Sequence, residues 1–593
     1  MDPIKVDFSQ SGSSGNSKGS GKDAYLAPDK AGTKTLIAII GTIIGALIAY
    51  YFMLPPMNFK STQMYLYFGV VAIIYVALQA LLSGLISKPE YTVYVKKKAV
   101  IPGIVILVLA VVVGLGMIVS SVVFRAGSYS RIIDVDESKT FVSDIAEADF
   151  QSVPVLDDAA AAALANRALG DLSSINMVSQ FELSGKFTQI NYKNAPVRVT
   201  TLAYGDIFKW FKNTGTGFPG YIVVDMVTQK AELVLLPEGS YIRYSTEEHF
   251  GKYLMRHLRF QYPTRLFDEP HFEINEAGEP YWLCPVLDKT IGLFGGTDVK
   301  GVVLVNAITG ECTEYTLDEV KTDPALQWID VIYSSNLLVE QYNYHGKYGG
   351  GFFNSIIVQD GVKVATEGSN FLAMNDDVYM YTGVTSVSGD QAIIGFVLVN
   401  MRTKEANFYE VSGAKEYSAA SSAEGVVQDY GYKATFPILL NISGQPTYFM
   451  SLKDTSSLVK RYAMVNVQNY QVVVTGETIA ECMEAYAQKL RQNNIRINVD
   501  IDEIKEATDN NDGDTSETPI VDTSKTITGK LTDIRTAVLG GDSVYFLQVE
   551  GSKKYFRIAA SQAETVVILN VGDTVTITYE KSSGAIQDAL RVE

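Results

Sequence analysis

The sequence predicts a membrane protein with three N-terminal transmembrane helices, then α+β modules with antiparallel sheets, then a small β-barrel. Three observations predict this class. Three long segments near the N-terminus contain no Asp, Glu, Lys, Arg or His, a strand-turn-strand template recurs three times, and short alternating segments follow an acidic stretch. With 593 residues, 47% of them hydrophobic, the chain is long enough to bury several cores.

The uncharged segments each exceed the roughly 20 apolar residues that cross a hydrocarbon core. They are also apolar on every side, whereas a helix of a soluble protein has one polar face exposed to water. Because none contains a charge, a channel or proton relay lacks its usual marker, and we expect the helices to act as anchors. Gly41 and Gly45 have the GxxxG spacing that suits close helix packing. The expected membrane region is residues 35–124, with helices at about 36–54, 64–86 and 100–124.

The loop lysines predict the orientation. The tail, residues 1–34, is rich in Gly and Ser and is expected to be a disordered cytoplasmic extension. It holds five lysines, and Lys96, Lys97 and Lys98 follow the second helix. By the positive-inside rule both lie in the cytoplasm, so we expect a multi-pass cell-membrane protein whose remainder is extracytoplasmic.

The charge is divided unevenly along the chain. Residues 1–126 carry a net charge of +6, which leaves −23 for the remainder. So large an acidic excess argues against nucleic acid or an anionic membrane surface as the partner of the outer region.

The outer region, residues 127–496, is expected to alternate helices with strands. Runs such as YIVVDMV and AIIGFVLVN are β-branched and bounded by Gly, Asn and Asp, as strands are. Thr478 and Glu481 have capping-box spacing at the start of an amphipathic segment. Helices are expected at residues 156–172, 247–260, 326–341 and 478–492.

A repeated template is the most specific internal signal. It reads Gly, three apolar residues, Val, Asp or Asn, two residues, then Thr, and it occurs at Gly220–Glu232, Gly301–Thr313 and Gly395–Asn407. Asp and Asn bond their own backbone in Asx-turns, and Thr adds a second local bond. We therefore interpret the polar positions as turn-forming, with a ligand role as the alternative: Asp225, Thr228, Asn306, Thr309, Asn400 and Thr403.

These hairpins, with helices between them, resemble the PepSY and cystatin-like domains found outside many bacterial cells. The resemblance covers about forty residues. It implies a helix packed on an antiparallel sheet in each unit, and binding, inhibition or modulation of an extracytoplasmic partner. It brings no catalytic residues.

The C-terminal part begins after residues 497–523, an acidic, apolar-poor stretch expected to be a linker. Residues 524–593 then offer five or six short alternating segments, whose order resembles an OB-fold barrel. Eight basic residues balance eight acidic ones over residues 525–593, so this barrel has no electrostatic footprint for nucleic acid.

Catalytic signatures are absent from the sequence. There are four histidines, and no HExxH motif is present. Glu269, His271 and Glu273 alternate on an expected strand, where they either hold a metal, perform acid-base chemistry, or form a solvated face, which is the preferred interpretation. We predict no cofactor, no metal site and no catalytic residue, although enzymatic activity stays open.

The three cysteines, Cys284, Cys312 and Cys482, form no CxxC pair. A Cys284–Cys312 bridge is one reading, and unpaired buried thiols are the preferred one.

An aromatic run next to flexible glycines, YNYHGKYGGGFF, is the candidate binding surface. Such residues can line sugar or peptide grooves, although a core-facing hairpin is the preferred interpretation. The candidate residues are Tyr342, Tyr344, Tyr348, Phe352 and Phe353.

These features favour a membrane-anchored extracytoplasmic binding, scaffold or modulator protein of a bacterial cell envelope. Its expected partners are the membrane itself and an extracytoplasmic protein or envelope polymer, not nucleic acid. The alternatives are an enzyme that acts on an envelope polymer through carboxylates, and a transmembrane sensor.

Overall fold

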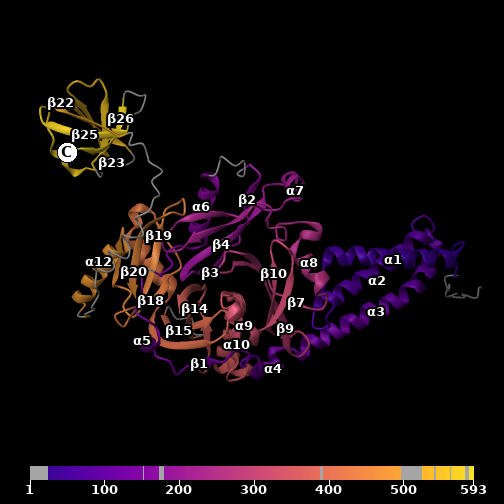
Figure 1. The fold of residues 1–593 in the computed structure, drawn as a ribbon. Helices are drawn as coiled ribbons and strands as arrows, with labels where there is room; N and C mark the ends of the chain where they lie inside the picture. The colour runs from indigo at the N-terminus through magenta and orange to yellow at the C-terminus, as the bar shows by residue number, and fades with distance from the viewer. Residues whose placement is uncertain are drawn as a thin grey trace, which may run out of the picture. The chain divides into compact units, whose positions relative to one another are not determined.

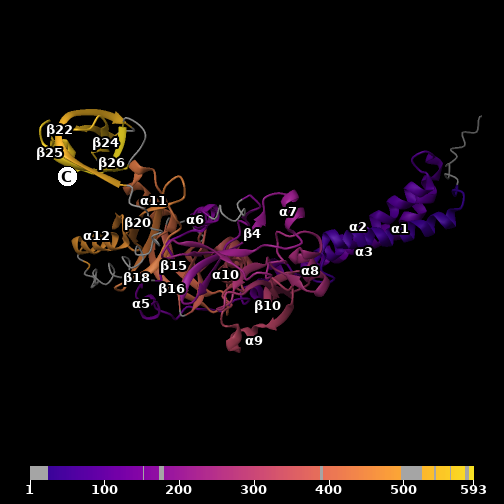
Figure 2. The ribbon, with the colours of Figure 1, turned by 45° about the horizontal axis from the view of Figure 1, so that its top comes forward.

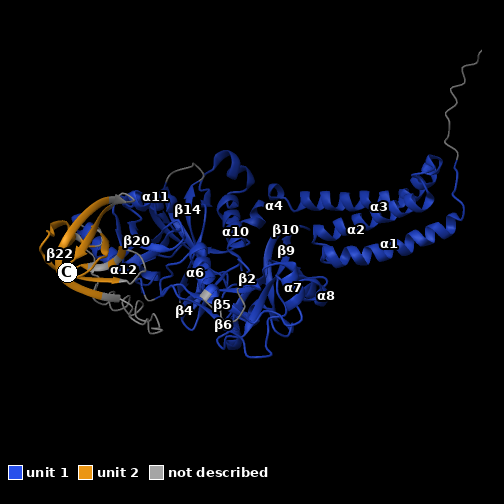
Figure 3. Ribbon diagram, turned by 90° about the horizontal axis from the view of Figure 1, so that it is seen from above, with its two compact units in different colours: residues 1–511 blue, residues 512–593 orange. Residues whose placement is uncertain are grey.

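The computed structural model divides into two compact units, residues 1–511 and 512–593 (Figure 3). The tail that precedes residue 25 and the linker at residues 497–523 lie outside the described residues. The structure describes residues 25–150, 152–171, 179–374, 376–386, 392–493, 495, 524–539, 542–560, 563–580 and 586–592.

Three helices near the N-terminus are long and apolar enough to cross a membrane, which confirms that prediction. The middle helix packs against both of the others (Figure 1). Gly41 and Gly45 lie at the contact between the first two, where an added Cβ would meet Leu78 at 3.0 Å and Ile74 at 3.1 Å. The helices are α1 (Ala31–Met53), α2 (Thr62–Ser83) and, after the short η1 (Pro89–Tyr91), α3 (Thr92–Val119).

A short segment leads from α3 to the β-rich part of the first unit. The side chain of Ser121 caps the next helix by accepting the N–H of Val123 at 3.2 Å. The elements of this segment are α4 (Val122–Tyr129), β1 (Val135–Asp136) and α5 (Phe141–Asp144), of which β1 pairs in parallel with β16 (Ala406–Ala414).

The β-rich part consists of four antiparallel sheets with one strand order. In each sheet the third, fourth and fifth strands form a meander, and the first two strands share the other edge of the third. The first sheet follows α6 (Asp158–Asp171) and contains β2 (Phe181–Leu183), β3 (Thr188–Tyr192), β4 (Ala195–Tyr204), α7 (Ile207–Asn213), β5 (Gly220–Asp225) and β6 (Ala231–Leu235). The second follows η3 (Phe250–Lys252) and α8 (Leu254–Gln261) and contains β7 (Leu266–Phe267), β8 (His271–Ile274), β9 (Pro280–Ile291), β10 (Gly295–Asn306) and β11 (Cys312–Thr316).

The third and fourth sheets repeat this plan, with β1 added to the edge of the third. After α9 (Leu317–Thr322), η4 (Pro324–Leu326), α10 (Ser335–Tyr348) and η5 (Asn354–Val358), the third contains β12 (Lys363–Ala365), β13 (Asn370–Met374), β14 (Asp377–Ser386), β15 (Ala392–Asn400) and β16. The fourth contains α11 (Glu416–Val426), η6 (Gln428–Tyr430), β17 (Lys433–Ala434), β18 (Ile438–Ile442), β19 (Gln445–Lys453), β20 (Val459–Asn466), β21 (Val473–Gly476) and α12 (Ile479–Gln492).

Each of the four sheets, with the segment that leads into it, forms one sheet unit. The four sheet units share a hydrogen bond from the turn after the fourth strand to the start of the third strand. The residue after each turn-forming Asp or Asn donates its N–H to the start of the long third strand, at 3.0 Å in every unit. The pairs are Met226 with Pro196, Ala307 with Pro280, Met401 with Val378, and Val467 with Pro446. The carbonyl of the same residue accepts an N–H from the chain that leads into the unit, donated by Val155, Tyr244, Tyr333 and Ala414. In each sheet unit, the segment that leads into the sheet is therefore hydrogen-bonded to the turn after the fourth strand.

The template found in the sequence marks three of these four units. The fourth has Arg461 in place of the initial Gly and Asn469 in place of Thr, yet Asn466 accepts the N–H of Asn469 at 2.8 Å as the other turn residues do. The fourth sheet therefore keeps the hydrogen bonds of the repeat, although its residues differ from the template.

Two of the expected helices differ from the observed ones. Residues 327–334, between η4 and α10, are not part of a helix, because Ile332 and Tyr333 donate their N–H groups to Met401 instead, and α10 begins only at Ser335. The segment expected at 247–260 is broken at Tyr253, whose backbone is extended. The expected capping box at Thr478 and Glu481 is present.

The second unit is a five-stranded barrel with its own core. Its strands pair in the closed order β22-β23-β24-β26-β25, and β24 and β26 run in parallel. Leu547, Phe556 and Ile577 are buried inside it. The elements are β22 (Ser524–Leu539), β23 (Asp542–Val549), β24 (Tyr555–Ala559), η7 (Glu564–Ile568), β25 (Thr574–Glu580) and β26 (Ile586–Val592).

Candidate functional site

The ends of the membrane helices are bonded directly to the second sheet unit. Arg256 and Arg259 on α8 donate to the carbonyls of Tyr51 and Leu54, at 3.1 and 3.0 Å, and so satisfy the free carbonyls at the end of α1. Figure 2 shows α8 beside the ends of these helices. The helices therefore hold the second sheet, β7 to β11, through specific contacts and are more than a flexible tether.

The third helix makes a second attachment. Ser120, directly after α3, accepts the N–H groups of Leu293 and Phe294 at 2.9 Å each. Gly116 leaves room for the Phe294 ring, since an added Cβ would lie 2.5 Å from it. The turn between β9 and β10 is thereby fixed to α3.

A groove on the β-rich part lies where turns of three units meet. It has two adjoining hollows of about 590 and 340 Å³, which share Asn275, Ala325 and Trp328. The larger is also lined by Asn191, Lys193, Asn194, Glu276, Ala277, Pro324, Gln327 and Asp376, and the smaller by Tyr281, Leu304, Asn306, Glu311, Thr313, Tyr315 and Leu326.

The lining residues stand on tight turns. Lys193 and Asn194, with φ of 54° and 64°, form the two-residue turn between β3 and β4, which is the geometry of a type I′ hairpin. Asn275 accepts the N–H groups of Ala277 and Glu279 and so shapes the turn between β8 and β9. Asn191 donates to Asp376 at 2.9 Å, which links the first and third units. Hydrogen bonds within and between these turns therefore hold the lining residues in place.

An aromatic pair forms one wall of this groove. The rings of Trp328 and Tyr281 have centroids 5.2 Å apart and planes at 41°. Trp328 is half-buried, whereas the other two tryptophans, Trp210 and Trp282, are buried. Trp328 is thus the tryptophan placed to meet a ligand.

Two buried carboxyl groups support the chain next to Trp328. Glu273 accepts the N–H groups of Asp330 and Val331 at 3.2 Å each, and Asp330 accepts that of Asn191 at 2.6 Å. Burial raises the pKa of Glu273 to about 8, despite the two N–H bonds. Burial, together with the charge of Glu273, raises the pKa of Asp330 well above its ordinary value. The pair therefore retains a proton near neutral pH and acts as a structural support.

The expectation of a solvated face at Glu269, His271 and Glu273 is wrong for two of the three. Glu273 is fully buried, and the Nε2 of His271 lies 2.5 Å from the carbonyl oxygen of Val331. Glu269 is exposed and pairs with Lys186. Within the described ranges no group of three or more His, Cys, Asp and Glu residues is arranged to hold a metal ion. The three cysteines are free thiols.

The aromatic run expected to bind a ligand lies away from this groove. It forms the C-terminal half of α10 and continues into η5, so the preferred hairpin interpretation is wrong. Tyr342 is buried in the core. The ring of Tyr344 packs on Tyr129 of α4 at 4.7 Å and stacks on Tyr348 at 6.0 Å. Phe352 contacts Phe353, which is 70% exposed.

The turn-forming repeat residues make the local bonds that their chemistry suggests. Asp225, Asn306 and Asn400 each accept two backbone N–H groups, from the second and third residues that follow. The second N–H belongs to Thr228, Thr309 and Thr403 respectively, and the last two hydroxyls accept a further N–H. Asn306 also lines the smaller hollow of the groove.

Sequence reasoning missed Trp328 because the expected helix at 326–341 placed it on a helical face. The signal that could have found it is Asp323-Pro324, which starts a turn directly before it, with Asp323 accepting the N–H of Ala325 at 2.9 Å. No protein-family model matches this chain, and no curated protein matches it.

Proposed function

We propose that this chain is a non-catalytic, membrane-anchored binding protein of the bacterial envelope, which holds a polysaccharide in the groove at Trp328. The observation that carries the proposal is the composition of that groove. Three aromatic rings, of Trp328, Tyr281 and Tyr315, stand beside five side-chain amides, those of Asn191, Asn194, Asn275, Asn306 and Gln327. Apolar faces with a few fixed polar groups are typical of ligand sites.

The charges of the groove oppose an anionic ligand. Lys193 stands against Glu276, Asp376 and Glu311, so acidic side chains outnumber basic ones three to one. Sugar rings offer hydroxyl groups to amides and an apolar face to aromatic rings. Because the turns are already fixed by hydrogen bonds, little ordering entropy is lost on binding.

A binding role is favoured over catalysis by the position of the carboxyls. A general acid must reach the proton it transfers. Glu273 and Asp330 carry a raised pKa of the kind that catalysis uses, but both are buried and bonded to backbone N–H groups. Burial raises both pKa values, and the charge of Glu273 further raises that of Asp330.

The proposal places the groove outside the cell, following the lysines that flank the helices. The proposal also includes two structural resemblances, of the four sheet units to PepSY domains and of the barrel to an OB-fold. A helix followed by an antiparallel sheet in all four units supports the PepSY-like assignment. The strand order of the barrel, its parallel β24–β26 pair and the η7 turn between β24 and β25 support an OB-like assignment. The bonds from α8 to α1 support a scaffold held at a fixed place above the membrane, rather than a mobile sensor.

The test is binding of glycans to the full-length protein in detergent. The probes are a β-1,4-linked N-acetylglucosamine hexamer and muramidase-digested peptidoglycan, and isothermal titration calorimetry measures their binding. We expect saturable binding, a loss of affinity of at least tenfold in Trp328→Ala, and retention in Trp328→Phe. Phe353→Ala, which removes an exposed ring outside the groove, is the matched control. The absence of binding to both probes, or equal binding by Trp328→Ala at unchanged thermal stability, would contradict the proposal.

A further inference from the structure

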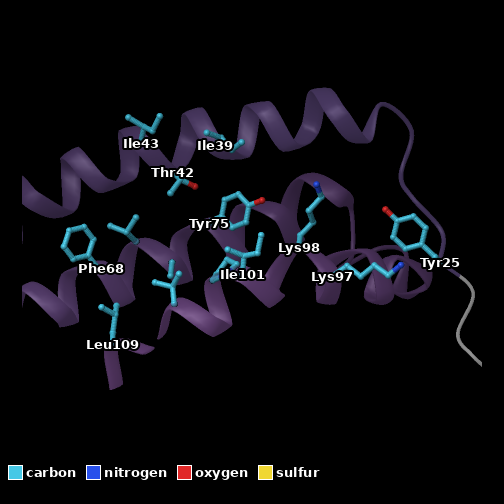
Figure 4. A pocket seen from close by; sticks show the side chains of 14 residues that line it. Tyr25, Ile39, Thr42, Ile43, Phe68, Tyr75, Lys97, Lys98, Ile101 and Leu109 are labelled. Carbon is cyan, nitrogen blue, oxygen red and sulfur yellow. The ribbon is translucent and has the colours of Figure 1, made fainter. Parts of the chain in front are cut away.

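The three membrane helices enclose a groove of about 780 Å³, which shares no lining residue with the groove at Trp328 (Figure 4). Helix α2 packs against both neighbours and forms its floor, with Phe68, Val71, Ala72 and Tyr75. One wall is α1, with Ile39, Thr42 and Ile43, and the other is α3, with Ile101, Pro102, Val105 and Leu109. The groove is lined almost throughout by apolar side chains.

Two lysines and a tyrosine stand at one end of the groove. Figure 4 shows Lys97, Lys98 and Tyr25 at the same end, away from Phe68 and Leu109. The ammonium of Lys97 lies 4.1 Å from the centre of the Tyr25 ring, and that of Lys98 lies 5.8 Å from the centre of Tyr94. No carboxylate lines the groove, and neither lysine forms an ion pair with any residue in the part of the chain that the structure describes. Among the described residues, no carboxylate therefore neutralises these two positive charges.

The lysines lie where lipid headgroups are found. They precede the uninterrupted apolar run that starts at Ala99, so they mark the border between headgroups and hydrocarbon. Basic pockets between membrane helices on the cytoplasmic side bind the headgroups of anionic lipids. We propose that this groove binds an anionic phospholipid, with its phosphate on Lys97 and Lys98 and its acyl chains along α2.

The lining favours a lipid over a transmembrane helix of a partner. Helices pack in membranes through small residues. The small-residue pair of α1, Gly41 and Gly45, already contacts α2, and Thr42 and Ala72 are the two small residues that line the groove. Branched and aromatic side chains at most of the other positions match flexible acyl chains.

The test is native mass spectrometry of the delipidated full-length protein with phosphatidylglycerol or phosphatidylcholine of the same chain length. We expect at least a tenfold preference for phosphatidylglycerol. The double variant Lys97→Gln/Lys98→Gln should lose it. Lys88→Gln/Lys96→Gln removes the same charge from lysines that do not line the groove, and should keep it. Circular dichroism checks that each variant is folded.

A second variant separates the groove from its charges. Ala72→Phe fills the floor and should abolish retention of phosphatidylglycerol with both lysines present. Inorganic phosphate at 10 mM should not displace the lipid, and displacement would mean that the lysines bind a simple anion. Equal losses in the two lysine pairs would indicate diffuse surface charge, and a co-purified helix in the groove would indicate a protein partner. Each of these three results would overturn the proposal.

Discussion

The Oε2 of Glu273 accepts the backbone N–H of Asp330 at 3.2 Å, so one buried carboxyl group positions the residue that carries another. Both side chains are inaccessible to solvent, at 0% and 1% exposure. Trp328 lies two residues before Asp330, and the shape of the groove therefore depends on this pair. Because both groups have a raised pKa, their contribution to stability depends on pH.

The first prediction concerns this pH dependence. The pKa of Glu273 is raised to about 8 in the folded protein, so the folded state binds a proton more tightly than the unfolded chain. The stability gained is complete below the ordinary pKa and is lost as pH rises through 8, by up to about 1.4 kcal/mol per pH unit for one proton. In Glu273→Gln this loss should disappear, so the stability of the wild type relative to the variant should fall as pH rises from 5 to 8. Thermal unfolding of the full chain measures it, with the exposed Glu269→Gln as control. Parallel profiles would refute the assignment.

The repeated turns allow a matched comparison. Asn400 is buried and donates to Asp377 at 2.9 Å, so Asn400→Asp removes that donor and sets two carboxylates side by side. We expect a loss of about 2 to 4 kcal/mol in the free energy of unfolding. Asn306→Asp, at a half-buried position, should cost less than about 0.5 kcal/mol, since Asp225 occupies the same place in the first unit. Denaturant titration distinguishes the two. Equal losses would mean that the turn bonds, rather than the neighbouring carboxylate, set the cost.

The features that the sequence predicted well are local. Transmembrane helices follow from composition alone, and the Asx-turn depends on residues within three positions of Asn306. The fourth unit was missed because it has Arg461 instead of Gly and Asn469 instead of Thr, while its defining bond joins Val467, in the turn after β20, to Pro446 in β19. A sequence motif does not predict a hydrogen bond between residues so far apart in the chain.

The candidate groove could not be predicted, for the same reason. Its lining comes from turns near Asn191, Asn275, Trp328 and Asp376, which only the packing of three units brings together. The aromatic run at Tyr342 was a reasonable local candidate, but tertiary packing buries Tyr342 in the core. Composition identifies which residues are able to bind, and the fold decides which of them meet.

Topology gives a third prediction. If Lys96, Lys97 and Lys98 are cytoplasmic, protease added to intact cells should digest the chain beyond Arg125 and leave the three helices protected. Inside-out vesicles are the control, since the same region should then survive and the N-terminal tail should be cut. Immunoblotting of an N-terminal and a C-terminal tag measures both. Protection of the C-terminal tag in intact cells would reverse the orientation.

The last prediction tests the bond between α3 and the second sheet unit. Ser120 is buried and accepts two N–H groups, those of Leu293 and Phe294, so Ser120→Ala leaves both donors without their partner. An unsatisfied buried donor costs about 1 to 3 kcal/mol. We therefore expect the amides of Leu293 and Phe294 to exchange with deuterium at least tenfold faster, because the turn opens locally before the sheet unfolds. Ser128→Ala on α4 is the matched control and should leave this exchange unchanged. If Ser120→Ala exchanges as the wild type does, packing of Phe294 against Gly116 alone holds the turn, and the hydrogen bonds contribute little to the rigidity of the attachment.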